Sequence, residues 1–335
     1  MDLRFNIRFV KIPLNFILQN YWTHFIVLFR KKVLNYSLFY FHFFWSFNFI
    51  IGKIVSDVIP PTSINFLRWL LPFLIFLSLN LKEIKLHRTI FRDKWGLILL
   101  LGVTGYCLNS ITFYEAVRLT TTINASVINA FNPVLITVAG YILYHERVTK
   151  IQLFGLILSL IGVLYIIFQG NWKFLLGLKI NVGDLFMFAC IASWAIHTVV
   201  YRQKAPRFPE KAMFPLMMLG GLLATLPVAL LENQAYQWSW ISQLRIIHVV
   251  GILCLNIFPS ILAYQFWNSA LRKVSANKVG IFLYLIPVFT TVISILFLRE
   301  SLHFFQIIGG LLIFIGVLLV TRSGFIKKTS EAPVQ

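Results

Sequence analysis

Apolar residues occur along this chain in long, nearly uninterrupted runs, separated by short polar segments that carry most of the charge. A transmembrane helix needs roughly 20 apolar residues, because the hydrocarbon core of a bilayer is about 30 Å thick. The runs are continuous rather than alternating, which favours helices over the strands of a barrel. Ten such runs cover roughly residues 36–54, 63–81, 95–114, 121–143, 151–168, 182–201, 212–231, 246–266, 276–298 and 303–321. The pattern therefore predicts an all-α integral membrane protein with ten transmembrane helices.

Residues 1–33, before the first run, are basic at both ends, and an amphipathic helical pattern lies between them. Leu14, Leu18 and Tyr21 fall on its apolar face, whereas Asn15 and Gln19 fall on the other. Such a helix lies in the membrane interface rather than crossing the bilayer. No small-residue cleavage site follows, so a removable signal peptide is not expected. A start codon assigned too far upstream explains the segment equally well.

Composition agrees with a membrane protein, since 59% of the 335 residues are hydrophobic and only 12% are charged. The formal net charge of +19 would suggest nucleic-acid binding in a soluble protein. Here the basic residues mark topology instead: with the N-terminus in the cytoplasm, 23 of the 30 lysines and arginines are cytoplasmic. We therefore expect a multi-pass protein of the cell inner membrane with both termini cytoplasmic. The three cysteines lie in apolar runs and indicate neither a disulfide framework nor a metal site.

The two halves of the chain match without a gap when one is shifted by 154 residues, as from Pro133 to Pro287. In the same register, Glu146 matches Glu300, Gly155 matches Gly309 and Gly162 matches Gly316. A weaker match pairs Trp45 with Trp194. Each half has five spans, and an odd number places the second half in the bilayer upside down, as in many secondary transporters. We predict two inverted five-helix repeats, 34–170 and 180–322, between an N-terminal arm (1–33) and a cytoplasmic tail (323–335).

Polar side chains inside the spans are the candidates for substrate contact, because such groups usually face the bundle interior or a wet cavity. Trp45 with Asn48 and Trp194 with His197 form two equivalent pairs, each on one helix face. Hydrogen bonding between helices is the competing interpretation. His197 could also titrate near neutral pH, so proton coupling is possible, although a lone histidine in a helix is more often structural.

A second group of candidates surrounds the two matched prolines. Proline removes an intrahelical hydrogen bond, and interrupted helices in both halves of a transporter indicate the binding site. Pro133 and Pro287 are therefore expected hinges or kinks, with Asn129, Asn132 and Tyr284 as substrate contacts. The remaining candidates lie on the third and eighth spans, where packing is the alternative role: Tyr106, Asn109, Asn256 and Tyr264.

Other conspicuous residues have plainer interpretations. Arg68 either snorkels to the interface or binds an anion or carboxylate. Glu146 and Glu300 are interpreted as turn residues, and Thr149 with Gln152 predicts a capping box for the fifth span. The seven-residue glycine spacing in spans five and ten predicts close helix packing, between the halves or between protomers.

No sequence feature indicates an enzyme or a cofactor. No carboxylate lies at mid-span, no Walker A loop occurs, and His145-Glu146-Arg147-Val148-Thr149 lacks the second histidine of a zinc motif. No GxSxG nucleophile elbow is present. We therefore expect no bound metal, no cofactor and no ATP binding.

The doubled motifs carry a family resemblance. They comprise Trp45 with Asn48, Arg68, Phe113-Tyr114-Glu115-Ala116, Asn132-Pro133-Val134, Glu146-Arg147-Val148-Thr149 and Gly155 to Gly162, then Trp194, Ala270, Ile286-Pro287-Val288, Arg299-Glu300 and Gly309 to Gly316. Over roughly 38–322 the chain resembles the drug/metabolite transporter superfamily, specifically its EamA-type ten-helix exporters. The resemblance implies a central cavity lined by spans 1, 3, 4, 6, 8 and 9, and export of amino acids or related metabolites. His145 and Arg299 stand where the family usually has glycine, which bears on those two turns.

The sequence thus predicts a secondary transporter of a small-molecule substrate that works by alternating access. Alternatives are an importer or exchanger, for example for S-adenosylmethionine, a membrane-embedded enzyme, and a non-transporting scaffold. The enzyme lacks any intramembrane catalytic constellation, and a scaffold does not need doubled polar groups at mid-span.

Overall fold

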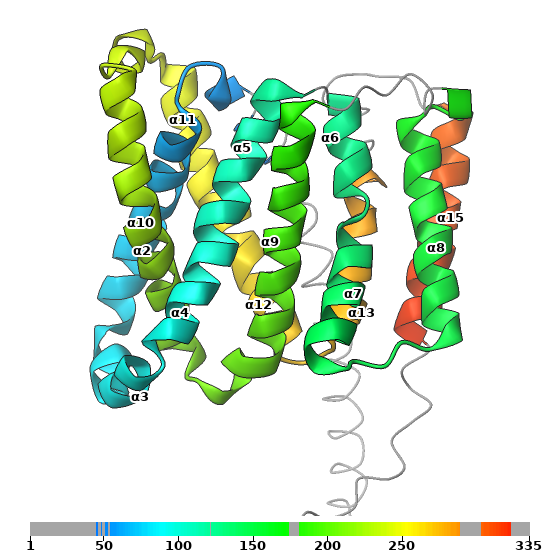
Figure 1. Ribbon diagram of the computed structural model, residues 1–335, viewed down its shortest axis with the longest axis horizontal. Helices are drawn as coiled ribbons and strands as arrows, with labels where there is room; N and C mark the ends of the chain where they lie inside the picture. The colour runs from blue at the N-terminus through cyan, green and yellow to red at the C-terminus, as the bar shows by residue number, and fades with distance from the viewer. Residues whose placement is uncertain are drawn as a thin grey trace, which may run out of the picture.

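The computed structural model describes residues 45, 48, 51–52, 54–120, 122–173, 181–288 and 303–322, and over them it is a bundle of roughly parallel and antiparallel helices (Figure 1). Eight helices of this part of the chain are long and apolar enough to cross a membrane, and each falls on a predicted run. The predicted arm (1–33), most of the first span, the end of the ninth span with Arg299 and Glu300, and the tail (323–335) lie outside the described residues. The predicted fold class, an all-α membrane protein, is confirmed.

The first half contains the short connecting helix α3 and a break between α6 and α7. They are α2 (Pro61–Leu86), α3 (Arg88–Asp93), α4 (Trp95–Gly102), the π-helical segment η1 (Val103–Leu108), α5 (Asn109–Leu119), α6 (Thr122–Asn129), α7 (Asn132–Tyr144) and α8 (Lys150–Ile167). Elements α4, η1 and α5 form one continuous span, Trp95–Leu119.

The second half repeats this order. Its elements are α9 (Val182–Lys204), the 3₁₀ turn η3 (Ala205–Arg207), α10 (Glu210–Ala235), the 3₁₀ turn η4 (Ser239–Gln243), α11 (Ile246–Leu255), the π-helical segment η5 (Asn256–Ala263), α12 (Tyr264–Leu271), α13 (Ala276–Gly280), the 3₁₀ segment η6 (Ile281–Leu285) and α15 (Phe304–Arg322). The two π-helical segments coincide under the 154-residue shift, which carries 103–108 onto 257–262 inside η5.

Helix ends follow the local signals in the sequence. The predicted capping box of the fifth span is present: Thr149 accepts from the backbone N–H of Gln152, whose side chain accepts from the N–H of Thr149. Asn181 and Asp184 form an equivalent box at the start of α9. Glu146 accepts a hydrogen bond from Gln203 of α9 at 2.9 Å, which agrees with its interpretation as a structural turn residue.

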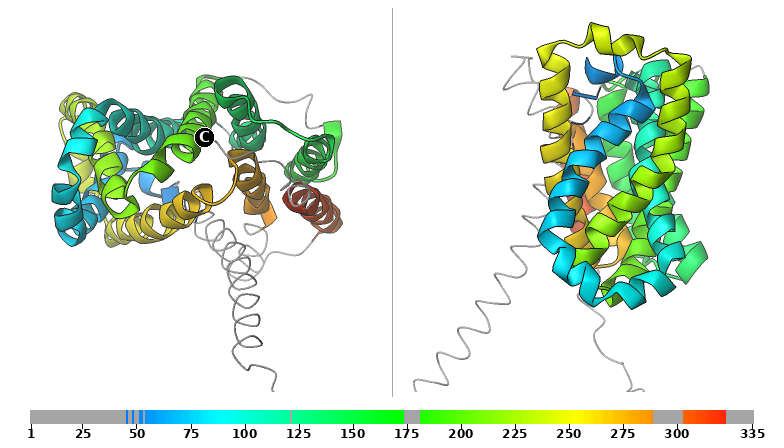
Figure 2. Two further views of the ribbon diagram at one scale, coloured as in Figure 1. Left: turned by 90° about the horizontal axis from the view of Figure 1, so that it is seen from below. Right: turned by 90° about the vertical axis from the view of Figure 1, so that its left-hand side faces the viewer.

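The predicted glycine packing joins α8 to α15, and these two helices lie side by side at one edge of the bundle (Figure 2). A Cβ on Gly155 would lie 2.7 Å from the carbonyl oxygen of Gly316, and one on Gly162 would lie 2.7 Å from that of Gly309. The glycines therefore pair crosswise between repeats, Gly155 with Gly316 and Gly162 with Gly309. This pairing makes the fifth and tenth spans antiparallel, as inverted repeats require.

A second sign of inversion comes from Arg118 and Arg272, which the 154-residue shift superimposes. Arg118 contacts Tyr236 at the C-terminal end of α10, whereas Arg272 contacts Glu210 at its first residue. Because α10 has 26 residues and an α-helix rises 1.5 Å per residue, its two ends lie about 39 Å apart. Equivalent residues thus lie at opposite ends of the bundle, and the two repeats are inverted.

The turn after α7 holds His145, which stands where the family resemblance implies a glycine, in a left-handed conformation. His145 is the C-terminal cap of α7 with φ 52° and ψ 34°, and the N–H of Glu146 donates to the Gly140 carbonyl, as in a Schellman motif. Because this left-handed conformation is unfavourable for residues with a Cβ, His145→Gly is expected to stabilise the protein by about 1 kcal/mol. Thermal unfolding of the detergent-solubilised protein checks this. His87→Gly, at a helix end with φ −105°, should give no such gain.

Candidate functional site

A cavity lies at the seam between the two repeats. Eight of its lining residues carry polar groups or indole rings, and the other four are apolar or weakly polar. The lining comprises Trp45, Asn48, Arg68, Asn109, Ser110, Phe113, Asn129, Asn132, Cys190, Trp194, Leu283 and Ile286. The sequence candidates Trp45, Asn48, Asn109, Asn129, Asn132 and Trp194 are therefore brought together.

Two tryptophans, one from each repeat, meet at this cavity. The ring centroids of Trp45 and Trp194 lie 5.4 Å apart, and both rings contact Tyr264, at 5.6 Å and 5.3 Å. The weak sequence match between the two tryptophans thus corresponds to a direct contact. They rest on a layer of rings behind them, which we call the aromatic cluster: Trp69, Tyr106, His197, Tyr201, Tyr264 and Trp267.

Arg68 enters the cavity lining from α2, although its side chain is only 1% exposed. Its Nε donates to Ser260 Oγ at 2.6 Å, and its Nη1 donates to Asn48 Oδ1 at 3.2 Å and to the Tyr114 hydroxyl at 3.1 Å. The guanidinium also lies 5.2 Å from the ring centre of Trp69. Arg68 is therefore held inside the bundle and does not snorkel to the interface.

The break between α6 and α7 places two asparagines at the cavity. Helix α6 ends at Asn129 and α7 begins at Asn132, with Pro133 in its first turn, where proline needs no N–H partner. Asn129 is half-buried, whereas Asn132 is 6% exposed and its Oδ1 has no hydrogen-bond partner among the described residues. In the second repeat, η6 changes the helix to 3₁₀ geometry just before Pro287. Both repeats are thus irregular at their matched prolines.

Three candidates lie in the aromatic cluster instead of the cavity lining. The Tyr264 hydroxyl donates to the Gly105 carbonyl at 2.6 Å, and Tyr106 is fully buried beneath it. His197 stacks on Trp194 with ring centroids 5.4 Å apart, and its Nδ1 lies 3.1 Å from the Leu101 carbonyl oxygen. For Tyr106 the reason is local geometry: η1 has hydrogen bonds between residues i and i+5, so Tyr106 and Asn109 do not share the face that an α-helix would give them.

Two further candidates lie elsewhere. Asn256 is buried in η5, and its Nδ2 donates to the Ile252 carbonyl of its own helix at 2.7 Å. Tyr284 packs in a core cluster with residues of α8 and α15, including Leu156 and Ile313. Its neighbours Leu283 and Ile286 line the cavity, because a 3₁₀ turn has three residues and presents a different face from an α-helix.

The expected set of lining spans needs two corrections. Span 8 contributes no residue to the observed lining, since Tyr264 and Asn256 are engaged in the framework, and span 2 contributes Arg68. Sequence reasoning also omitted Ser110, Cys190, Leu283 and Ile286. Ser110 adjoins the candidate Asn109, but no pattern distinguishes Cys190, Leu283 or Ile286 from ordinary apolar helix residues.

A helical membrane bundle of two inverted repeats with a polar cavity at their seam is the architecture of a membrane transporter. The chain belongs to the EamA-like transporter family, whose model matches residues 35–168 and 181–322. This membership confirms the predicted resemblance and places the protein among transporters rather than enzymes.

Relatives and solved structures agree. An uncharacterized transporter of Bacillus subtilis, YyaM, is 27% identical over 86% of this chain and 92% of its own. The Salmonella typhimurium protein named "Probable amino-acid metabolite efflux pump" is 24% identical over 86% of this chain and 94% of its own. A solved crystal structure aligns with 87% of this chain and 97% of its own at a TM-score of 0.69 and 18% identity, a likeness of fold alone.

Proposed function

We propose that this protein is a secondary transporter of the cell inner membrane that exports amino acids or related small metabolites by alternating access. The halves 34–170 and 180–322 would rock about the cavity, with both chain termini in the cytoplasm. The observation that carries the proposal is the cavity itself, because its lining comes from both repeats and includes a residue pair, Trp45 and Trp194, that their symmetry relates.

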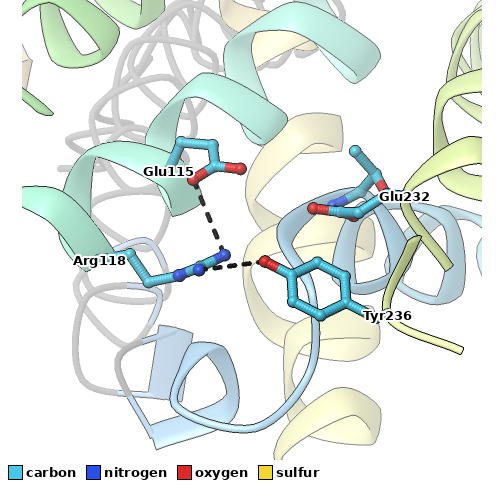
Figure 3. A network of polar contacts seen from close by, with 5 residues as sticks. Glu115, Arg118, Glu232 and Tyr236 are labelled. Atoms are coloured by element: carbon cyan, nitrogen blue, oxygen red, sulfur yellow. Dashed lines mark hydrogen bonds and ion pairs between the residues drawn. The ribbon is translucent and has the colours of Figure 1, made fainter. Parts of the chain in front are cut away.

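Two polar clusters at opposite ends of α10 support alternating access. At the C-terminal end, Arg118 of α5 lies 3.9 Å from Glu115 and donates to the Tyr236 hydroxyl at 3.4 Å, with Glu232 beside them (Figure 3). Glu232 in turn accepts from the Thr62 N–H of α2 at 3.1 Å. We call this set the Arg118 latch.

The equivalent cluster is the Arg272 latch. Arg272 lies 3.6 Å from Glu210 and donates to the Tyr201 hydroxyl at 3.2 Å and to the Phe208 carbonyl at 3.1 Å. Repeat symmetry thus gives each end of the bundle an arginine that contacts an end of α10. The Arg118 latch joins α5 of the first repeat to α10 of the second, whereas the Arg272 latch joins the end of α12 to α9 and α10 within the second repeat. Releasing either latch would free that end of α10 and favour opening of the cavity on that side.

Amino acids as cargo and export as direction rest on the family and on the name of the Salmonella relative. Import or exchange of a metabolite is the alternative, since the same inverted architecture works in either direction. Proton coupling through His197 stays a prediction. The residue is buried behind Trp194, so coupling through it would require movement of that ring.

The test is transport by the purified protein in liposomes. Counterflow is measured for a panel of amino acids, nucleoside-like cofactors and cationic drugs, with and without a pH gradient. Asn129→Ala and Trp45→Ala are expected to reduce flux several-fold while insertion and thermal stability stay close to wild type, because they remove cavity contacts.

The matched controls are Asn80→Ala, whose side chain bonds only its own helix, and Trp172→Ala, which is 45% exposed. Both should transport as the wild type does. Unchanged flux in both cavity variants, or equal losses in the controls, would discredit the cavity as the transport site. Absence of counterflow for every compound would favour a scaffold.

A further inference from the structure

Arg68 is a buried cation that has no anionic partner among the described residues. The three groups that accept its hydrogen bonds, Ser260, Asn48 and Tyr114, are all neutral. None of the ion pairs between described residues includes it. Asp184, the buried carboxylate of the described residues, is engaged by Thr120 and by Asn181 at the start of α9. A charge inside a membrane protein is costly to bury, so its retention indicates a function.

Arg68 lines the cavity and has one nitrogen that is not engaged by any described residue. Its Nη2 is buried and has no hydrogen-bond partner among the described residues, while Nε and Nη1 are both engaged. The orientation of the guanidinium is thus fixed by Ser260 of η5, Asn48 of the first span and Tyr114 of α5, and Nη2 is the nitrogen that these described contacts leave unengaged. A guanidinium held in this way offers its Nη2 to a carboxylate as the donor of a charge-assisted hydrogen bond.

The rest of the lining suits a ligand that carries a cationic group and an apolar part in addition to its anionic group. Asn132 offers a buried, unpaired acceptor in Oδ1, and Asn129 adjoins it on α6. Trp45, Trp194 and Phe113 supply aromatic surface. An ammonium group suits the asparagine oxygen and the faces of indole rings. The cavity therefore offers a donor from α2, an acceptor from α7 and rings from both repeats.

We propose that Arg68 is the carboxylate-binding residue of this cavity, and that the substrate class is an amphipathic zwitterion: a free carboxylate on Arg68, an ammonium group toward Asn132 Oδ1, and an apolar side chain against Trp45 and Trp194. This inference rests on the proposed function, since it names the substrate class of the transport cavity. The proposal implies that amines, amides and esters, which lack a free carboxylate, are not substrates of the cavity.

Binding to the purified wild-type protein in nanodiscs tests the proposal separately from transport. The probes are L-phenylalanine, L-leucine and L-methionine. Phenylalaninamide and 2-phenylethylamine are matched compounds that lack the carboxylate, and 3-phenylpropionate is a matched compound that lacks the ammonium group. We expect saturable binding of at least one of the amino acids, at least tenfold tighter than that of phenylalaninamide or phenylethylamine. Equal binding of acid and amide, or no binding of any carboxylate, overturns the proposal.

Variants then assign the discrimination to Arg68. Arg68→Gln is expected to weaken amino-acid binding at least tenfold while leaving the weak binding of phenylethylamine within twofold, and Arg68→Lys should restore part of the loss. Ser260→Ala removes one partner of the guanidinium but keeps the charge, so the preference for the acid should persist. Unaltered discrimination in Arg68→Gln contradicts the assignment, and if that variant does not fold, the wild-type comparison of acid and amide decides.

Failure of the two proposals looks different. A protein that binds the acid selectively but produces no counterflow would refute transport and leave the carboxylate site standing. A protein that moves acid and amide equally well would transport by the proposed route without the proposed recognition.

Discussion

Replacing Gly316 by alanine is expected to lower the free energy of unfolding by about 3 kcal/mol, at the upper end of the usual cost of overpacking. The added methyl would collide with Ser159 Oγ and with the Gly155 carbonyl oxygen across the α8–α15 contact. A backbone carbonyl cannot rotate away, so the two helices must separate. Their whole contact would loosen, since close backbone approach is what holds such helices together in lipid.

The measurement is thermal unfolding of the solubilised protein, and α15 supplies its own controls. Gly309→Ala, the partner of Gly162 in the same contact, should behave as Gly316→Ala does. The adjacent Gly310→Ala should leave stability unchanged or slightly raised, because nothing lies within 4 Å of its added Cβ and alanine is the better helix former. Equal effects at Gly309 and Gly310 would contradict the packing argument.

Arg272→Gln and Arg118→Gln are expected to change cavity access in opposite senses, each by about tenfold. Each substitution breaks one latch and leaves its counterpart intact. A shift of about 1.4 kcal/mol between inward-open and outward-open states corresponds to a tenfold change in their populations. Arg272→Gln should favour opening at the end of α10 that holds Glu210, and Arg118→Gln at the end that holds Tyr236.

A reporter cysteine at Asn129, with the three native cysteines replaced by serine, is labelled by an impermeant maleimide from each side of the membrane. Each variant should raise the labelling rate from one side and lower it from the other. Tyr201→Phe removes one hydrogen bond of the Arg272 latch and should act in the same sense but more weakly. Arg92→Gln, which breaks an exposed ion pair, should change neither rate. Parallel changes from both sides in the two latch variants would show that the clusters do not gate the cavity.

Much of the cavity could be anticipated residue by residue. Trp45, Asn48 and Trp194 were recognisable because polar and aromatic groups inside a span avoid lipid, and because the internal repeat pairs Trp45 and Asn48 with Trp194 and His197. Asn129 was recognisable because it lies just before Pro133, which the repeat matches with Pro287. Tyr106 and Tyr284 could not be placed in the same way. Each lies in a segment that departs from 3.6 residues per turn, η1 or η6, and nothing in a single sequence announces a π-helical or 3₁₀ turn inside an apolar run.

Arg68 illustrates the other gap between sequence and site. Its three hydrogen-bond partners lie 20, 46 and 192 residues away along the chain. When a transmembrane helix is considered by itself, an arginine near its end is expected to extend its side chain to the membrane interface. Only the packing of α2 against α5 and η5 turns it inward and satisfies all but one of its nitrogens.

The sequence by itself determined that the chain is helical, crosses the membrane many times and is built from two inverted halves. The helical spans follow from the length of the apolar runs, because a backbone in lipid must satisfy its own hydrogen bonds. The inverted halves follow from the internal repeat of five spans. The tertiary structure decided which polar side chains face the cavity, which support it from behind, and which glycines join the halves. These outcomes depend on contacts between residues distant in the chain and on local changes of helical pitch, neither of which a hydropathy pattern records.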